Sequence, residues 1–415
     1  MSKLTRSVVG KNIFYMALVQ CANYIVPLVM LPYLSRVIGV DGVGVLAMAL
    51  SVCAIAVIFT DFGFAISSTV WIAKNKDKWK LLEKYVTAIF CIKIIFIFII
   101  SIAIFIYTTK FGTDENKYKV MGVIVSATVF FQAFQCTWFF QGLEKMKNIT
   151  ICTVTTKMSY LFLVVVFVKS HGDEVVALIC FCISNLISTA LYLYLMKHEG
   201  FKFRQVSKLQ IFKIFKDNLP FFYSRVAVGI YSNASTFIVG SQAGVRQAAF
   251  YSSSEKLYQA SISLTSPISQ SLYPHLAKTK DIKTLIKFMA VLLPLMVIGV
   301  IICVINSTYI ITLIYGQDFQ SGSEIFKYFI VISVISFISI NFGYPAYSTI
   351  DRLDIVNKSV ILGGVIQLLL LGVLYLTTNI NGLNVVKSLL ISESCVCMFR
   401  VFMFYRTSMA MRLVK

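Results

Sequence analysis

Charged residues are scarce in this chain, because Asp, Glu, Lys and Arg together make up only 13% of its 415 residues. Soluble proteins average roughly 25%. Hydrophobic residues make up 58% of the chain, above the roughly 45–50% that is usual in soluble domains. The combination excludes a soluble enzyme.

Histidine is rarer still, and the usual signatures of catalytic and metal sites are missing. The three histidines lie at the ends of apolar segments or between them: His171, His198 and His275. Neither the phosphate-binding pattern GxxxxGK[ST] nor the zinc-protease pattern HExxH occurs. The ten cysteines fall in apolar segments, and their closest pairs are separated by a single residue, which is not a zinc-site spacing. We therefore expect no enzyme, no metal, no organic cofactor and no ATP hydrolysis by this chain.

Acidic residues are also few, since 18 Asp and Glu stand against 38 Lys and Arg, a net charge of +20. In a soluble chain this excess would indicate nucleic acid as a partner. Here the basic residues gather in every second connection between apolar runs, which is typical of a polytopic membrane protein with one set of loops on the cytoplasmic side. We expect membrane lipids as partners, and no nucleic acid.

Long apolar runs are abundant. Residues 85–107 read YVTAIFCIKIIFIFIISIAIFIY and residues 285–306 read LIKFMAVLLPLMVIGVIICVIN, each long enough for the ~20 residues that cross a bilayer. Counting such runs predicts an all-α integral membrane fold with twelve transmembrane helices. The predicted spans are centred near residues 23, 56, 95, 130, 159, 186, 230, 261, 296, 337, 367 and 395.

The basic residues orient these spans. With the N-terminus inside, 25 Lys and Arg fall in inner connections and tails and 6 in outer connections. An even number of spans places both termini in the cytoplasm. The N-terminal sequence lacks the short apolar core and small-residue cleavage site of a removed signal peptide, so we expect the first span to be retained.

The longest inner connection, residues 197–219, follows the sixth span and predicts two six-helix lobes, residues 1–208 and 209–415. The halves resemble each other weakly after the fourth span of each. FFQGLEKMKNITICTVTTKM in one half matches PAYSTIDRLDIVNKSVILGG in the other, each with an acidic-basic pair, Glu144-Lys145 and Asp351-Arg352. Repeated halves around a central site are typical of transporters.

Seven basic residues remain within spans or at their ends. Lys93 follows Lys84 by nine residues, which places it ~13 Å into the membrane, while Lys327, Lys387 and Arg400 lie nearer span ends and are expected to be boundary charges. A charge at the membrane centre costs ~2.5–3.5 kcal/mol on insertion scales, so each deep one needs an explanation. The deep cations are Lys93, Lys157, Arg225 and Lys256, and the deep acids are Asp61, Glu255 and Glu393.

Two interpretations of these charges remain open. They pair with one another and hold helices together, or the cations line a water-filled cavity that attracts an anionic substrate. Neutral groups on the same spans would add ligands in the second case, although amides also join membrane helices. These neutral groups are Asn23, Gln132, Gln135, Tyr231 and Asn233.

Several segments, in order along essentially the whole chain, resemble the bacterial polysaccharide flippases, the lipid-linked oligosaccharide branch of the multidrug/oligosaccharidyl-lipid/polysaccharide exporter superfamily. The segments are PLVMLPYLSRVIGVDGVGVLAMA, TWFFQGLEKMKNIT, FYSSSEKLYQASISLTSPISQSLYPHLAK and LIYGQDF. The block FQGLEKMK is the most specific of them.

The resemblance implies an O-antigen flippase of the bacterial inner membrane with the two-lobed fold of this superfamily. It would move an undecaprenyl-pyrophosphate-linked sugar repeat unit outward, alongside a polysaccharide polymerase and a chain-length regulator as further partners. In this interpretation Lys93, Lys157, Lys256 and Arg225 attract the pyrophosphate and Arg36 guards the outer end. The neutral groups contact sugars, and Asp61, Glu255 or Glu393 couples transport to a proton or sodium ion.

Two alternatives stay open. A multidrug or organic-cation exporter of the same superfamily would need an acidic, aromatic-lined cavity, whereas the deep cations here outnumber the deep acids. An O-antigen polymerase-type membrane enzyme would need substantial outer loops that carry acid-base groups. The longest outer connections, near residues 108–119 and 307–324, are short.

Overall fold

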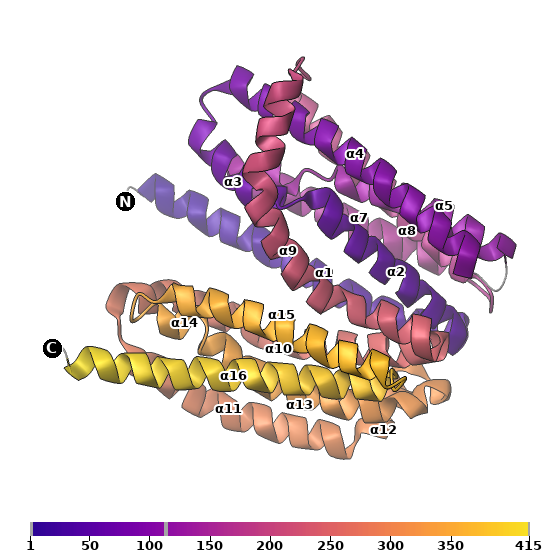
Figure 1. The fold of residues 1–415 in the computed structure, drawn as a ribbon, viewed down its shortest axis with the longest axis vertical. Coiled ribbons are helices and arrows are strands. Elements are labelled where there is room, and N and C mark those ends of the chain that lie inside the picture. The colour runs from indigo at the N-terminus through magenta and orange to yellow at the C-terminus, as the bar shows by residue number, and fades with distance from the viewer. Residues whose placement is uncertain (1–2, 112–114, 414–415) are drawn as a thin grey trace. The chain divides into compact units, whose positions relative to one another are not determined.

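The computed structural model describes the backbone of residues 3–111 and 115–413. The side chains described are those of the same residues except 3–10, 12–13, 110–111, 115, 224, 227–228, 230–233, 264–268, 270–272, 274–275 and 410–413. Within this part of the chain there is no β-strand, and twelve helices have 19 residues or more (Figure 1). The long helices are α1 (Lys3–Val37), α2 (Gly39–Asp61), α4 (Trp79–Phe111), α5 (Glu115–Ala133), α7 (Met146–Phe167), α8 (Glu174–His198), α9 (Lys208–Ala243), α10 (Val245–Thr279), α11 (Ile282–Ile305), α13 (Ser323–Asn341), α15 (Leu353–Leu376) and α16 (Gly382–Leu413). The short ones are α3 (Phe64–Asn75), α6 (Thr137–Gly142), α12 (Ser307–Tyr315), η1 (Gln317–Gly322) and α14 (Tyr344–Tyr347).

Each of the twelve predicted span centres falls in a different long helix. In the described part of the chain, nine segments are apolar and long enough to cross a membrane. The other three long helices, α9, α10 and α16, are more polar but have 36, 35 and 32 residues, which exceeds the ~20 that a bilayer requires. The all-α integral membrane fold is confirmed.

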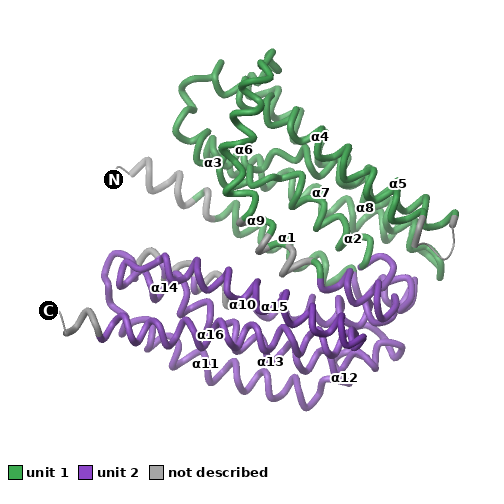
Figure 2. The backbone as a smooth tube through the Cα atoms, in the orientation of Figure 1, with its two compact units in different colours: residues 1–30, 48–234 green, residues 31–47, 235–415 purple. Residues whose placement is uncertain are grey.

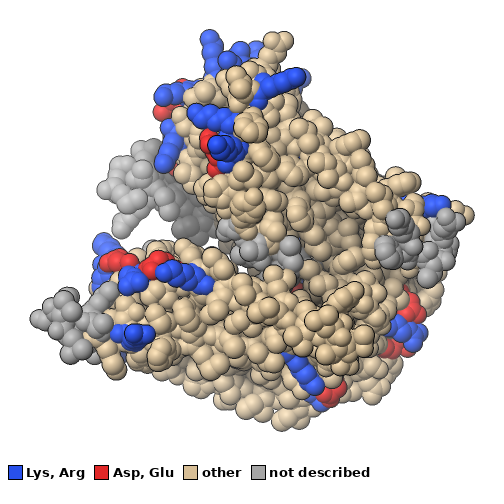
Figure 3. All heavy atoms as spheres, in the orientation of Figure 1, with Lys and Arg blue, Asp and Glu red and all other residues tan. Residues whose placement is uncertain are grey.

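The helix flanks are apolar and exposed. Phe98, Ile298 and Leu376 have 69%, 55% and 82% of their surface exposed, an arrangement that would make a soluble protein aggregate. On the face drawn in Figure 3, charged atoms gather near helix ends and uncharged ones cover the flanks. The exposed apolar flanks of the helices are therefore suited to contact with the hydrocarbon core of a bilayer.

Packing divides the chain into two compact units (Figure 2). Unit 1 comprises residues 1–30 and 48–234, and unit 2 comprises residues 31–47 and 235–415. In unit 1, Phe62 stacks on Phe215 and Phe222, with ring centroids 4.8 and 4.4 Å away. In unit 2, Tyr347 packs edge-on against Phe404 at 5.5 Å. The predicted lobe boundary at residues 208 and 209 was placed in a connection rather than by packing, and it stays a prediction.

The weak sequence repeat corresponds to a repeated turn. The fourth span of each half is interrupted near the end that the charge bias assigns to the inner side, where α6 follows α5 in unit 1 and α14 follows α13 in unit 2. Glu144 and Asp351 then both adopt positive φ, 62° and 54°. The following basic residue closes each turn through its N–H, from Lys145 to the Phe140 carbonyl at 2.8 Å and from Arg352 to that of Tyr347 at 3.2 Å.

The ion pairs between helices agree with the inner and outer sides that the distribution of basic residues assigns. Every such pair among the described residues joins two inner or two outer segments. The inner pairs are Lys76–Glu144, Lys145–Glu199, Arg204–Glu83 and Lys280–Asp351, and the outer pairs are Lys117–Glu174 and Arg246–Asp41. Two inner pairs correspond between the units, because Lys76–Glu144 and Lys280–Asp351 each join the connection after the second span of a half to the repeated turn.

Candidate functional site

Lys93 is the most buried of the predicted cations whose side chains are described, with 2% of its surface exposed. Its Nζ donates a 2.8 Å hydrogen bond to the carbonyl of Ala133, the last residue of α5. The ammonium also lies 5.8 Å from the centre of the Trp138 ring. The last carbonyls of a helix lack intrahelical partners and carry partial negative charge, so in this structure Lys93 caps the interrupted end of α5.

Predicted amides lie beside the same interruption. Gln135 Nε2 donates to Asn185 Oδ1 of α8 at 2.9 Å. Gln132 Oε1 is buried and has no hydrogen-bond partner among the described residues. A buried acceptor without a partner is costly, and a hydroxyl or amide of a ligand would satisfy it. Gln132 is thus a stronger sugar-contact candidate than Gln135.

Glu255 and Lys256 form a small polar cluster in unit 2. Glu255 accepts hydrogen bonds from Thr236 Oγ1 at 3.4 Å and Gln259 Nε2 at 3.3 Å. Gln259 Oε1 in turn accepts from Lys256 Nζ at 3.3 Å. The Gln259 amide therefore links the Glu255 carboxylate and the Lys256 ammonium. A change of charge on Glu255 would alter its hydrogen bonds with Thr236 and Gln259.

Asp61 lies where the second span is interrupted. α2 ends at Asp61, and Phe62 and Gly63 follow with φ of 49° and 80° before α3 begins. Asp61 Oδ2 accepts from the N–H of Ala65 at 3.3 Å. A carboxylate is favourable at this end of a helix because the first N–H groups have no helical partner. The geometry explains why an acid is tolerated so deep in a span.

The remaining predicted residues lie on α1, α7, α9 and α16. Arg36, in the unit 2 part of α1, donates to the carbonyls of Pro32 at 3.2 Å and Leu313 at 2.6 Å. Arg225 is exposed on α9, and Asn23, Lys157 and Glu393 are half-buried on α1, α7 and α16. The side chains of Tyr231 and Asn233 lie outside the described residues.

Arg400, which the sequence predicts to be a boundary charge, bonds two neighbouring helices. α16 continues to Leu413, so Arg400 lies well within the helix. Its guanidinium donates to Ser359 Oγ at 2.8 Å, and to the carbonyl and hydroxyl of Ser339 at 2.8 and 3.0 Å. Arg400 therefore joins α16 to α13 and α15, close to where α13 ends.

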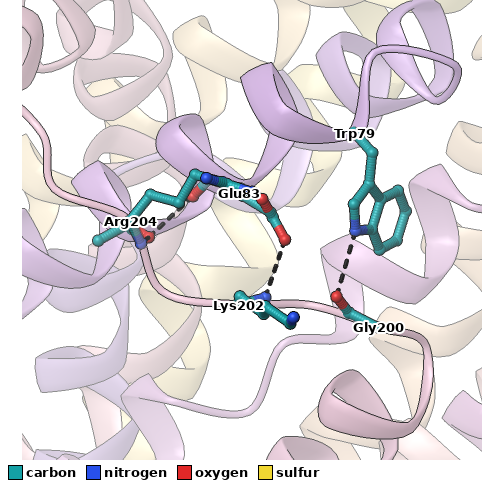
Figure 4. A network of polar contacts seen from close by, with 6 residues as sticks. Trp79, Glu83, Gly200, Lys202 and Arg204 are labelled. Carbon is teal, nitrogen blue, oxygen red and sulfur yellow. Dashed lines mark hydrogen bonds and ion pairs between the residues drawn. The ribbon is translucent and has the colours of Figure 1, made fainter.

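Sequence reasoning missed the contacts of Glu83, which is 1% exposed near the start of α4. Its carboxylate accepts from the Lys202 N–H at 3.1 Å and pairs with the Arg204 guanidinium, while Trp79 Nε1 donates to the Gly200 carbonyl at 3.3 Å (Figure 4). These bonds hold the first part of the connection between α8 and α9 against α4. The signal was present, since Glu83 is an acid among the basic residues of an inner connection.

Comparisons with known proteins identify a family and relatives that match most of this chain. Residues 9–280 match the family described as "Polysaccharide biosynthesis protein". A protein of Escherichia coli (strain K12) named "Putative O-antigen transporter" is 24% identical over 405 residues, which cover 96% of this chain and 97% of that protein. A protein of Shigella dysenteriae with the same name is 26% identical over 365 residues, 86% of this chain and 91% of that protein. Both relatives are named as transporters, in agreement with the prediction that the chain is not an enzyme.

Solved structures show the same fold. The lipid II flippase MurJ in an inward closed conformation matches with a TM-score of 0.72 and 14% identity, over 96% of this chain and 90% of that one. An inward-facing multidrug resistance MATE family transporter of the MOP superfamily matches with a TM-score of 0.62 and 12% identity, over 97% and 99%. The predicted superfamily fold is confirmed.

Proposed function

Because this chain belongs to the polysaccharide biosynthesis protein family, we propose that it is a flippase for undecaprenyl-pyrophosphate-linked polysaccharide repeat units, such as those of O-antigen, and that it works by alternating access. The observation that carries the proposal is a flippase-like fold over 96% of the chain, together with family membership and intramembrane cations. A lipid-linked pyrophosphate is anionic, and Lys and Arg are the side chains that pair with phosphate oxygens.

The candidate residues are proposed to have different tasks. Arg225 is exposed and Lys256 is half-buried, so both are proposed to bind the pyrophosphate, together with Lys157, and Arg36 is proposed to act at the outer end. Lys93 is proposed to act through the end of α5, because its ammonium is already bonded to a carbonyl. The sugars are assigned to Asn23, Gln132, Gln135, Tyr231 and Asn233.

Ion coupling is proposed at acids with polar neighbours. Glu255 is the leading candidate because its two hydrogen-bond donors would rearrange when a proton or sodium ion binds. Asp61 and Glu393 are further candidates. The Glu255→Gln variant should retain insertion but lose the dependence of transport on the ion gradient.

The proposed setting is the bacterial inner membrane with both termini in the cytoplasm and lobes of residues 1–208 and 209–415. The inner excess of basic residues supports this orientation, as do ion pairs that join like sides. A polysaccharide polymerase and a chain-length regulator are the proposed partners, because a translocated repeat unit must be consumed on the outer face.

The test is complementation of a bacterial strain whose own flippase gene is deleted. The wild-type chain should restore surface polysaccharide, seen as a ladder on gels of cell-envelope extracts. Arg225→Ala should abolish the ladder, and Arg225→Lys should restore part of it because the charge remains. Lys216→Ala, which removes an exposed cation from the same helix, is the matched control and should behave as wild type.

Two outcomes would contradict the proposal. If Arg225→Ala supports a normal ladder, the cation is not needed for an anionic substrate. If the wild-type chain restores no polysaccharide but makes cells resistant to cationic drugs, the protein is a multidrug exporter of the same fold. Immunoblots of membrane fractions must show equal insertion of all variants.

A further inference from the structure

A cavity of about 520 Å³ opens in unit 1 at the inner ends of its helices. Residues of α3, α4 and α9, and of the connection that precedes α9, form its wall. These helix ends adjoin basic inner connections, so the cavity lies at the depth of the headgroups of the inner leaflet. None of the intramembrane charges considered above lines it.

The cavity wall is predominantly cationic. Lys74 of α3, Lys84 of α4 and Lys213 of α9 contribute three positive charges, and Asp217 contributes one negative charge. All four residues are exposed, so their charged groups are accessible to a ligand. Lysine is a common partner of phosphate because its compact ammonium donates three hydrogen bonds. A net excess of two positive charges matches a pyrophosphate diester, which carries one negative charge on each phosphate.

The neutral part of the wall suits a sugar. Trp71 and Tyr85 lie stacked with ring centroids 3.8 Å apart and an interplanar angle of 13°, and both line the cavity. Aromatic rings combine a large apolar face with a polar edge, which fits the mixed surface of a pyranose. The exposed Gln210 adds an amide that can bond a sugar hydroxyl.

Apolar residues complete the cavity. Ile66, Val70 and Phe221 line it and are 46%, 52% and 41% exposed. A prenyl chain attached to the pyrophosphate would cover these side chains and remain in the bilayer. A simple anionic phospholipid would use the cations and the apolar surface, but it would leave the stacked rings and the Gln210 amide unused.

We propose that this cavity is an inner-leaflet docking site that binds the pyrophosphate and first sugar of the lipid-linked substrate before translocation. The inference rests on the proposed function and adds a site separate from the predicted intramembrane cations. Lys74, Lys84 and Lys213 bind the phosphates, Trp71 packs against the sugar, and Asp217 weakens the affinity so that the substrate can leave.

The test measures binding of a short-chain prenyl-pyrophosphoryl-N-acetylglucosamine to the full chain by calorimetry in phosphatidylcholine nanodiscs. The Lys74→Gln/Lys84→Gln/Lys213→Gln variant should raise Kd by about tenfold or more, since several charge-assisted hydrogen bonds are lost. The matched control is Lys78→Gln/Lys80→Gln/Lys216→Gln, which removes equal charge from exposed neighbouring positions outside the cavity. It should change Kd by less than about twofold.

A second variant tests the opposite sign. Asp217→Asn removes the negative charge of the wall and should lower Kd several-fold, because the anionic probe is no longer repelled. Equal weakening by both triple variants would reduce the site to non-specific attraction and overturn the proposal. So would equal displacement of the probe by phosphatidylglycerol, which would identify a bulk-lipid site, or the absence of probe binding to the wild-type chain.

Complementation separates this inference from the proposed function. If the wild-type chain restores surface polysaccharide and the Lys74/Lys84/Lys213 triple variant does so equally well, the docking site is overturned while the flippase function stands. If the wild-type chain restores none, the proposed function itself fails. A loss of polysaccharide in the triple variant but not in its control supports both.

Discussion

Lys93 and Arg400 show how a cation on a membrane helix can be stabilised by the backbone of a neighbouring helix. Lys93 of α4 bonds the last carbonyl of α5, and Arg400 of α16 bonds the Ser339 carbonyl, two residues before α13 ends. Both partners lie where a span is interrupted, so carbonyls there lack helical N–H donors. The cost of an intramembrane charge is offset by the charge-assisted bond and by the negative end of the helix dipole.

Replacement of Lys93 by Met tests this structural contribution. The variant has a similar shape but leaves the Ala133 carbonyl without its donor, and an unsatisfied buried acceptor costs about 1–3 kcal/mol. The apparent Tm of the purified protein in detergent should therefore fall by about 1–3 °C. Lys80→Met, at an exposed position of the same helix, should leave Tm unchanged. A Lys93→Met protein with the wild-type Tm and no surface polysaccharide would instead identify Lys93 as a substrate ligand.

The position of Lys93 far from the ends of its predicted span identified it as unusual. The sequence did not identify the group that it bonds. The interruption of α5 contains no proline, because residues 134–136 read FQC, so nothing local marked a free carbonyl there. The bonds of Arg400 could not be predicted for a related reason, because Ser359 and Ser339 are 41 and 61 residues away in the sequence. Partners in both cases depend on which helices pack together, and a hydropathy pattern does not contain that information.

At the scale of elements, the repeated turn is the feature that the sequence indicated and the structure explains. Its acidic residues, Glu144 and Asp351, both adopt the left-handed backbone conformation. Glu144 pairs with Lys76 and Asp351 pairs with Lys280, each a lysine of another inner connection. A non-glycine residue pays for this conformation with backbone strain. Ion pairing of the side chain gives one reason for an acid rather than glycine at these positions.

Paired substitutions at Glu144 separate the two effects. Glu144→Ala and Glu144→Gly both remove the ion pair with Lys76, but only glycine adopts positive φ without a steric penalty. The Gly variant should therefore be more stable than the Ala variant by about 1 kcal/mol, seen as a higher Tm in detergent. Ala and Gly variants of Asp351 should differ in the same direction. Equal stability of the two variants at both positions would contradict a strained turn.

At the scale of the whole chain, the sequence predicted the number of long helices because hydrophobic length is a local property, and the twelve span centres each fall in a helix. The short helices α3, α6 and α14 were not predicted, since they continue apolar runs that read as single spans. The candidate site was predicted only as a set of unusual residues. From the sequence the lysines of the docking cavity are only orientation signals, because Lys213 is far in sequence from Lys74 and Lys84 and adjoins the same cavity only after folding.

The orientation itself can be tested in both units with single introduced cysteines. Lys80→Cys in unit 1 and Lys283→Cys in unit 2 replace exposed inner residues, whereas Lys169→Cys and Gln320→Cys replace exposed outer ones. A membrane-impermeant maleimide added to intact spheroplasts should label the outer pair, and the inner pair should react only after lysis. Comparison with the unsubstituted chain corrects for its ten free cysteines. Labelling of Lys80→Cys or Lys283→Cys before lysis would mean that the 25-to-6 distribution of basic residues does not set the topology. Labelling of Lys80→Cys would also place the docking cavity at the outer leaflet, where the substrate is released and not collected.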